Sequence, residues 1–476
     1  MSITEMTALS LAQKLHTGEL KITQALDAYY AAIGASDLNC YTVLCKEQAY
    51  ARAAEVQARL DAGDARSALA GVPVAVTDLI CTMGIETTCG SNMLRGFVPP
   101  FDAAVIEKLA AADLILLGKT NLDEFAMGSS TQTSAFGPTK NPHDPARTPG
   151  GSAGGAAAAV AAGEAPIALG SDTGGGLRQP ASHCGVTGLK PTYGAVSRHG
   201  LVAYASSMDQ IGPIARDAAD CAALFGIIQG KDERDSTSMA PPAPAERPPL
   251  KKGALRVGLP KEFFGEGVSP EVAEAVLALK DKLAAQGAQV GECSLPLTEY
   301  AVPAYYILAC AEASSNLARF DGIKYGHASE KAQNLRDTYL LSRSEGFGME
   351  AKQRVMLGNL ALSAGQYDAY YNKALRAKRL IQQSFFDAFE EFDVLLAPAA
   401  PTTAPLLGET GSTAMCLGDV CTVPASIAGL PALSVPSGTD ANGMPIGAQL
   451  IGRPFEEGVL LEVASSLSPK TPPAAT

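Results

Sequence analysis

Two glycine clusters lie close together in this sequence, at residues 150–155 and at residues 174–176. Glycine allows positive φ and close approach of the backbone to a ligand, but it costs stability inside helices and strands. Successive backbone N–H groups in such a cluster can converge on an anion, or on the negative charge that develops during acyl transfer. The alternative is a pair of tight turns in an α/β fold. The spacing alone does not choose between an anion site and simple turns.

The segments around the clusters alternate between helical and strand patterns. Ala156–Ala162 has the composition of a helix, and Ile167–Leu169 is a short apolar run typical of a buried strand. Val72–Val76 and Leu114–Leu117 are further runs of that kind. We therefore predict an α/β fold in which a mixed, mostly parallel central sheet is covered by helices on both faces.

The remaining chain predicts further helices and one boundary. Apolar residues recur at helical spacing from Thr7 to Ala35, which predicts two helices, and Glu47–Ala62 predicts another. Residues 231–252 are polar and proline-rich, so we expect a surface linker there. A strand at Leu255 and a helix over Pro270–Gln286 follow. We expect residues 1–476 to form a single domain that contains this linker.

Composition excludes several classes of function. The 476 residues carry a formal charge of −12, which argues against a broad basic face for nucleic acid. No apolar run approaches the ~20 residues that span a bilayer, and the N-terminus lacks a signal-peptide layout, so we expect a soluble cytoplasmic protein. The ten cysteines are scattered, which favours free thiols, and the five histidines show no metal-ligand spacing. We expect no metal site.

The stretch Thr148–Ala181, with GGSAGG followed by GSDTGGGLRQPA, resembles the signature of the amidase-signature family of serine amidohydrolases. Members of this family use a Ser–cis-Ser–Lys triad. The resemblance puts the bridging serine on Ser152, the nucleophile on Gly176 and the lysine base on Thr77. Glycine has no side chain with which to attack, so the resemblance implies that two of the three catalytic groups are substituted.

Within this family, several long segments are similar to the glutaminase (A) subunits of amidotransferases that act on Glu-tRNA(Gln) or Asp-tRNA(Asn). They are Phe125–Pro142, Ala304–Gly326, Ser342–Tyr371 and Thr422–Gly438. In those enzymes the A subunit hydrolyses glutamine, the B subunit uses the ammonia and ATP to amidate the tRNA, and the C subunit holds the two together. The resemblance implies the B and C subunits as partners in a heterotrimer, and tRNA contact only through the B subunit. It implies no cofactor in this chain, with ATP and Mg²⁺ on a partner, and no membrane contact.

The resemblance also assigns binding residues. It puts an oxyanion hole on the backbone N–H groups of Thr173, Gly174 and Gly175 and of position 176. It puts glutamine recognition on Arg354, Asp419 and a tyrosine of the pair Tyr305 and Tyr306. Arginine can bind an α-carboxylate with two hydrogen bonds, and aspartate can pair with an α-ammonium group, so these residue types suit an amino acid. The alternative for Arg354 and Asp419 is an ordinary surface ion pair.

Some residues around the site match the family signature and others depart from it. Asp172 and Arg178 match the family pattern, which implies an intact local turn. Departures from the pattern are Leu79, Gln132, Ala153, Ala156 and Ala195. Ser152 is retained, but a serine hydroxyl is a weak nucleophile without an adjacent base.

Three hypotheses follow from this mixture. In the first, the chain is a glutaminase-subunit homologue that has lost glutaminase chemistry and acts as a partner-binding or ligand-binding pseudoenzyme, or whose catalytic positions were substituted deliberately to trap substrate. In the second, it is an active amidohydrolase with a different nucleophile. In the third, it is a non-enzymatic scaffold that no longer binds glutamine.

Overall fold

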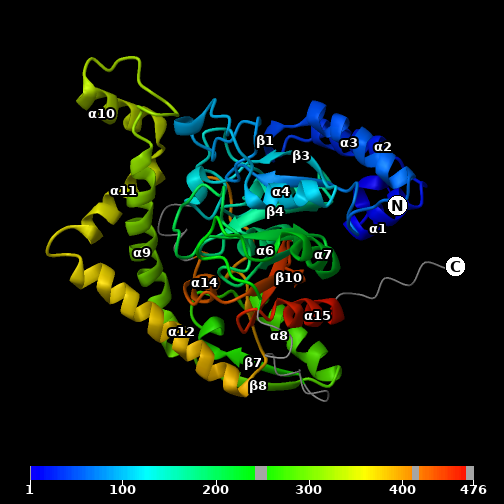
Figure 1. The fold of residues 1–476 in the computed structure, drawn as a ribbon. Coiled ribbons are helices and arrows are strands. Elements are labelled where there is room, and N and C mark those ends of the chain that lie inside the picture. The colour runs from blue at the N-terminus through cyan, green and yellow to red at the C-terminus, as the bar shows by residue number, and fades with distance from the viewer. Residues whose placement is uncertain (1, 242–254, 410–417, 468–476) are drawn as a thin grey trace.

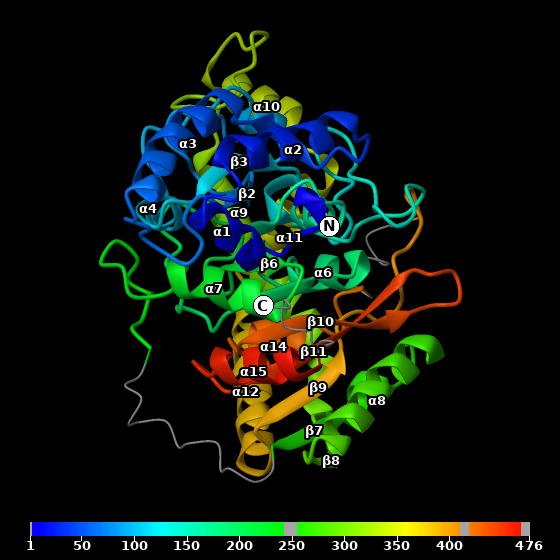
Figure 2. The ribbon, with the colours of Figure 1, turned by 90° about the vertical axis from the view of Figure 1, so that its right-hand side faces the viewer.

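The computed structural model describes residues 2–241, 255–409 and 418–467 and is built on one sheet. The sheet has 11 strands in the order β1-β3-β2-β4-β6-β5-β10-β11-β9-β7-β8. The strands are β1 (Tyr41–Leu44), β2 (Pro73–Thr77), β3 (Ile115–Thr120), β4 (Ile167–Asp172), β5 (Thr187–Lys190), β6 (Gln210–Ala215), β7 (Arg256–Pro260), β8 (Gln289–Cys293), β9 (Val394–Pro398), β10 (Ala432–Thr439) and β11 (Pro445–Gly452). Figure 2 shows this order running from β3 and β2 at the top of the view to β8 at the bottom.

The sheet is mixed, as predicted, but its parallel share is smaller than expected. The pairs β2–β3, β2–β4, β7–β8 and β7–β9 are parallel. Every other named pair is antiparallel. The expectation of a mostly parallel sheet was therefore wrong in this detail. A short connection, such as the one between β10 and β11, reverses the chain and makes the two strands antiparallel. Parallel neighbours need a longer crossover connection.

Helices cover both faces of the sheet. They are α1 (Ala8–His16), α2 (Ile22–Ala35), α3 (Lys46–Asp61), α4 (Ala104–Ala111), α5 (Gly154–Ala161), α6 (Arg178–Cys184), α7 (Ala218–Ile228), α8 (Pro270–Ala285), α9 (Ala301–Asn316), α10 (Leu335–Gly346), α11 (Met349–Leu362), α12 (Lys373–Glu391), α14 (Val423–Ile427) and α15 (Glu457–Leu467). Figure 1 shows α9 to α12 along the left side of the strands, and α1, α2, α3 and α7 on the right. Strand β9 shows the division, because Leu395 and Ala397 join one apolar cluster while Val394 and Leu396 join the other.

Local sequence explains where these elements begin and end. The apolar run predicted as a strand at Val72–Val76 forms β2, in which every residue is buried. Helix α8 begins where Ser269 accepts a hydrogen bond from the Val272 N–H and Pro270 occupies the first turn. The two helices expected between Thr7 and Ala35 are α1 and α2. Periodicity thus predicted these elements to within a few residues.

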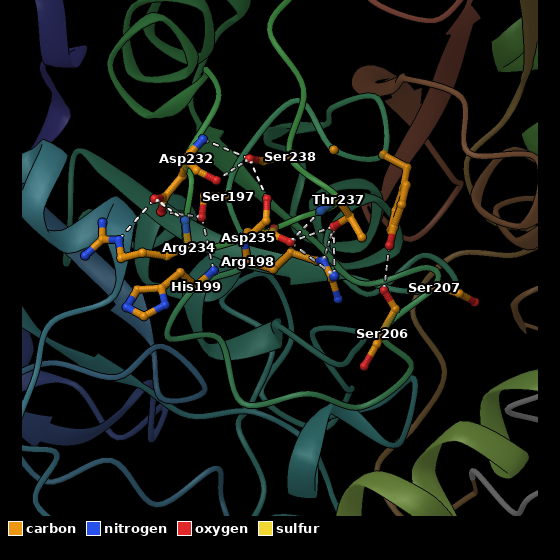
Figure 3. A network of polar contacts seen from close by, with 12 residues as sticks. Ser197, Arg198, His199, Ser206, Ser207, Asp232, Arg234, Asp235, Thr237 and Ser238 are labelled. Carbon is orange, nitrogen blue, oxygen red and sulfur yellow. Dashed lines mark hydrogen bonds and ion pairs between the residues drawn. The ribbon is translucent and has the colours of Figure 1, made fainter.

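The structure describes the first part of the proline-rich segment 231–252, and the remainder lies outside the described residues. The described part is tied to the turn that carries Ser197 and Arg198 (Figure 3). The Ser197 hydroxyl donates to Asp232 at 2.8 Å, and the Arg198 N–H donates to Asp235 at 2.8 Å. Burial opposes ionisation of Asp232, but hydrogen bonds from its neighbours lower its pKa to about 2. The segment therefore begins as a fixed part of the fold.

Two further features concern the described residues as a whole. Every cysteine in them is a free thiol, as predicted, and Cys416 lies outside them. None of the described helices combines the length and apolar character needed to cross a bilayer.

Candidate functional site

A narrow cavity brings most of the predicted site residues together from distant parts of the chain. It lies at the carboxyl end of β4, between the two glycine clusters and helices α9 and α11. Its lining consists of Ala126, Gly128, Gly151, Ser152, Thr173, Gly174, Gly175, Gly176, Tyr305, Arg354 and Asp419. The two remaining predicted residues, Thr77 and Tyr306, do not line this cavity.

Gly176 occupies the turn between β4 and α6, opposite Ser152. Its φ lies outside the left-handed region, so a side chain here would not be strained by the backbone. A Cβ at this position would lie 2.7 Å from the Ser152 Oγ and 3.0 Å from the Ser171 carbonyl oxygen. A side chain at position 176 would therefore project directly at the Ser152 hydroxyl.

Glycine is required at two other positions of this turn. A Cβ on Gly174 would lie 2.6 Å from the ring of Tyr305, and one on Gly175, whose φ is +143°, would lie 2.1 Å from the Thr422 Oγ1. Within the described residues, the N–H groups of Gly174, Gly175 and Gly176 donate to no protein acceptor. These three N–H groups are available to a ligand in the cavity.

A buried ion pair between Arg178 and Asp172 holds the glycine turn that lies between these two residues. Arg178 and Asp172 are both fully buried, with the guanidinium Nε 2.9 Å from one carboxylate oxygen and Nη2 3.1 Å from the other. The other N–H groups of Arg178 donate to Thr422, Ser426 and Gln449. Burial opposes ionisation of Asp172, but the charge of Arg178 brings the net pKa below its ordinary value. All five donors of Arg178 thus have acceptors, as a buried guanidinium requires.

Asp123 holds the first glycine cluster in place. Its carboxylate accepts hydrogen bonds from the N–H groups of the loop 130–133, at distances from 2.8 to 3.2 Å. The Asp123 N–H donates to the Ser152 carbonyl at 3.1 Å. The Gly151–Ser152 peptide bond in this frame is cis. A Cβ on Gly151 would lie 2.2 Å from the Asp123 carboxylate, so only glycine fits there.

The Ser152 hydroxyl faces the cavity without a base. Among the described side chains, no carboxylate, imidazole or amine hydrogen-bonds to it. Thr77, at the end of β2, is fully buried, and its own hydroxyl has no hydrogen-bond partner among the described atoms. Threonine has no basic group, so nothing at position 77 can accept a proton from Ser152.

A buried lysine nearby does not take over this role. Lys119 pairs in register with Val76 of β2 while Thr120 pairs with Thr77, so Lys119 and Thr77 point to opposite faces of the sheet. The Lys119 ammonium donates to the Ile80 carbonyl and to two threonine hydroxyls, with Asp78 3.8 Å away. Burial lowers the pKa of Lys119, and the Asp78 carboxylate partly offsets that effect. Lys119 is a structural lysine.

Arg354 reaches the cavity from α11 and is held by neighbours. Its side chain is only 4% exposed, its Nε lies 2.8 Å from Glu350, and its Nη1 contacts the Tyr204 hydroxyl. The guanidinium also lies over the rings of Tyr204 and Tyr306, at 5.5 and 5.1 Å from their centroids. The alternative of an ordinary surface ion pair with Asp419 was therefore wrong for this arginine.

Asp419 supplies a carboxyl group on the same side of the cavity. It is only partly exposed, and the Tyr306 hydroxyl donates to it at 3.0 Å. Burial raises the pKa of Asp419 to about 7, against the lowering effects of Tyr306 and Arg354. Tyr306 thus acts on the cavity through Asp419, while Tyr305 lines the cavity itself.

Sequence reasoning missed Tyr204, Glu350 and Asp123. Glu350 and Arg354 stand four residues apart in a helical segment, which is the spacing of a helical ion pair, so this partner could have been found. Tyr204 and Asp123 approach the site only through the tertiary fold. No spacing in the sequence indicates them.

The fold is that of the amidase family, and the chain belongs to it. The family model described as Amidase matches residues 24–461. Curated relatives named as the A subunit of glutamyl-tRNA(Gln) amidotransferase include one from Agathobacter rectalis, which is 52% identical over 98% of this chain and 94% of its own length.

Solved structures agree with this membership. The crystal structure of the A subunit of glutamyl-tRNA(Gln) amidotransferase from Thermotoga maritima has a TM-score of 0.76 and 37% identity, covering 99% of this chain and 96% of that one. A native peptide amidase from Stenotrophomonas maltophilia has a TM-score of 0.80 and 28% identity, covering 97% of this chain and 96% of that one.

Proposed function

We propose that this chain is the glutaminase-type A subunit of a tRNA-dependent amidotransferase, and that it binds glutamine without hydrolysing it. The observation that carries the proposal is the cavity between Gly176 and Arg354. It combines ligand-binding groups with a nucleophile position that has no side chain. The full-length similarity to proteins named as amidotransferase A subunits supports the assembly.

The charges of the cavity suit an amino acid amide. Arg354 offers a guanidinium for the α-carboxylate, and Asp419 offers a carboxylate for the α-ammonium group. The free N–H groups of the turn 174–176 are suited to the amide oxygen, which is where negative charge develops during hydrolysis. We propose that these groups, with Thr173, form the oxyanion hole. Glutamine then binds with its amide carbon close to position 176.

Hydrolysis fails in this proposal because no group can attack that carbon. A serine at position 176 would lie against the Ser152 hydroxyl. Glycine has no side-chain oxygen at this position, so no nucleophile is present there. Ser152 has no base among the described side chains, and Thr77 cannot replace the lysine of the family triad. The oxyanion donors alone support at most a residual rate.

The proposal includes the setting in which the chain works. The B and C subunits are its partners in a heterotrimer in the cytoplasm, and residues 1–476 form one domain of that assembly. ATP and Mg²⁺ belong to the B subunit, which alone contacts the tRNA, charged with either glutamate or aspartate. Ammonia then reaches the B subunit from free ammonium instead of glutamine.

Binding and hydrolysis of glutamine by the purified chain test the proposal together. We expect calorimetry to detect glutamine at millimolar concentration, with binding lost in Arg354→Ala, while release of ammonia stays at background. A turnover of about one per second, an ordinary enzymatic rate, would instead support an active amidohydrolase with another nucleophile. Absence of binding at millimolar glutamine would support the non-enzymatic scaffold.

A second test uses the assembled complex. With the B and C subunits present, we expect amidation of the misacylated tRNA with ammonium chloride and none with glutamine. Equal rates from glutamine and ammonium would refute the loss of glutaminase chemistry. Failure of the three chains to co-purify would refute the assembly itself.

A further inference from the structure

A buried carboxylate lies beside the glycine turn, where strands β4 and β6 are paired. The two strands are antiparallel, and Asp172 at the end of β4 pairs with Gln210 at the start of β6. The next residues along this register, Thr173 and Asp209, therefore lie opposite each other. The Thr173 hydroxyl donates to Asp209 at 2.7 Å, and both residues are buried. Asp209 thus holds the residue from which the glycine turn begins.

The same carboxylate holds a second segment of the chain. Asp209 also accepts hydrogen bonds from the Tyr204 N–H and the Ala205 N–H, both at 3.0 Å. The Asp209 N–H donates to the Ala205 carbonyl at 2.9 Å, which closes the turn 205–209. A buried donor that loses its acceptor destabilises the chain, so these hydrogen bonds keep the two segments in a fixed relation.

Tyr204 extends this restraint to the other end of the ligand cavity. Its side chain is buried, and its hydroxyl accepts a hydrogen bond from Arg354. Its carbonyl accepts one from Asn316 of α9 at 3.2 Å, so its backbone is held at both the N–H and the carbonyl. Asp209 is therefore linked directly to Thr173 and, through Tyr204, to Arg354. Both Thr173 and Arg354 line the cavity, whereas Asp209 does not.

The separation of these two ends decides which ligand can reach both. In the proposed complex, the N–H groups of the glycine turn bind the amide oxygen and Arg354 binds the α-carboxylate. Asparagine is one methylene group shorter than glutamine. A site that holds both ends rigidly discriminates between the two amino acids, whereas a site with one loose end adapts to either.

We propose that Asp209 is a positioning residue that fixes the separation between the glycine turn and Arg354, and thereby favours glutamine over the shorter asparagine. This inference rests on the proposed function, which supplies the ligand. It adds the residue that sets the length of ligand that the cavity prefers.

The alternative is a carboxylate that only stabilises the fold, and Asp220 provides the matched control for it. Asp220 is also fully buried, and it accepts hydrogen bonds from the Ala8 and Leu9 N–H groups at the start of α1. It does not line the cavity or contact a residue that does. Loss of its charge should lower stability without changing the preference between ligands.

The test measures the Kd of the full-length chain for glutamine and for asparagine by calorimetry. In Asp209→Asn, at least one backbone N–H loses its acceptor whichever way the new amide is turned. We expect the Kd for glutamine to rise about tenfold and the Kd for asparagine to rise less than about threefold, because only glutamine depends on both ends. Asp220→Asn should lower the melting temperature and leave both Kd values unchanged.

A second variant breaks the same link with a smaller change. Thr173→Val removes only the hydroxyl that donates to Asp209, so it keeps the test decisive even where Asp209→Asn does not fold. We expect it to reduce the preference for glutamine in the same direction. The double variant Thr173→Val/Asp209→Asn should weaken glutamine binding by less than the product of the two single effects, because both changes break one link.

Each outcome decides between alternatives. A larger loss for glutamine than for asparagine in both variants, absent from Asp220→Asn, supports the positioning role. Weakening of both amino acids by the same factor, or a Kd for glutamine that does not change, overturns that role and leaves the proposed function intact. Failure of the unmodified chain to bind glutamine at millimolar concentration overturns the proposed function and this inference with it.

Discussion

Replacing Thr77 by lysine and Gly176 by serine should together restore glutamine hydrolysis, where neither change does so alone. Serine at position 176 would supply a nucleophile beside Ser152, and the resemblance to the family triad assigns the base to position 77. The turn and the side chains that we propose for glutamine recognition already line the cavity. The double substitution Thr77→Lys/Gly176→Ser thus adds the two missing groups to an otherwise intact site.

The structure sets the cost of each change. The Cβ of Gly176→Ser would lie 2.7 Å from the Ser152 Oγ, a hydroxyl that can rotate away, and 3.0 Å from a backbone oxygen. This crowding lowers the free energy of unfolding by about 1 kcal/mol. Replacing a glycine whose φ suits other residues raises it by about 0.4–1 kcal/mol, because the unfolded chain becomes less flexible. The change at Thr77 is costlier, because burying an ammonium group without full hydrogen bonding costs several kcal/mol. We expect a folded variant with reduced stability.

The gain in rate follows from what such groups supply. Removing nucleophile and base from a serine hydrolase lowers kcat by about a millionfold, equivalent to ~8 kcal/mol. Imperfect placement of the new lysine will recover only part of this, because a shift of about 1 Å costs about a hundredfold. We expect the double variant to exceed background by about a thousandfold, and each single variant by less than about tenfold.

The assay is ammonia release from glutamine, coupled to glutamate dehydrogenase, with the B and C subunits present. Thr77→Lys/Gly176→Ala is the matched control, because it fills the same space at position 176 without an oxygen, and it should stay at background. The reasoning is refuted if the serine double variant binds glutamine by calorimetry, keeps its fold, and is no faster than the alanine control.

Three further predictions follow from the site. In the proposed complex the charged form of Asp419, whose pKa is about 7, pairs with the ammonium group of glutamine. The Kd for glutamine should therefore weaken about tenfold from pH 8 to pH 6, where only about a tenth of the carboxyl is ionised; calorimetry on Asp419→Asn should show no such dependence. Tyr204→Phe removes a hydroxyl that holds Arg354 and should weaken glutamine binding about three- to tenfold, with a melting temperature within a few degrees of the unmodified chain; equal affinity would contradict the positioning role. Arg178→Met leaves the Asp172 carboxylate buried without its partner and should lower the free energy of unfolding by about 3–5 kcal/mol; urea unfolding measures this, and a loss below about 1 kcal/mol would contradict it.

The sequence predicted the elements of the fold better than their pairing. Apolar runs such as the one that forms β2 are local signals, and they marked strands correctly. Strand direction depends on which neighbour each strand finds, as when β4 pairs parallel with β2 on one side and antiparallel with β6 on the other. No local pattern contains that choice, so the parallel share was overestimated.

The parts of the candidate site that lie in the glycine clusters and in the segments that resemble the family could be predicted from the sequence. The residue types of the two glycine clusters indicated the turn, whereas Ser152 and Arg354 were assigned through the resemblance to the family. The restraint of Arg354 by Tyr204 could not be predicted, because the two residues come from distant segments that meet only after folding. The relation of Thr77 to Lys119 was also hidden, since it depends on the register of β2 against β3.

The loop held by Asp123 has a consequence for the dynamics of the chain. Residues 130–133 belong to no helix or strand, and loops of that kind usually exchange their amide hydrogens with solvent quickly. Here those amides all donate to one fully buried carboxylate, beside the segment that carries Ser152. Their deuterium uptake should therefore be as slow as that of the central strands. An irregular loop that opens only when the sheet does would keep the geometry of the cavity constant on the timescale of ligand exchange.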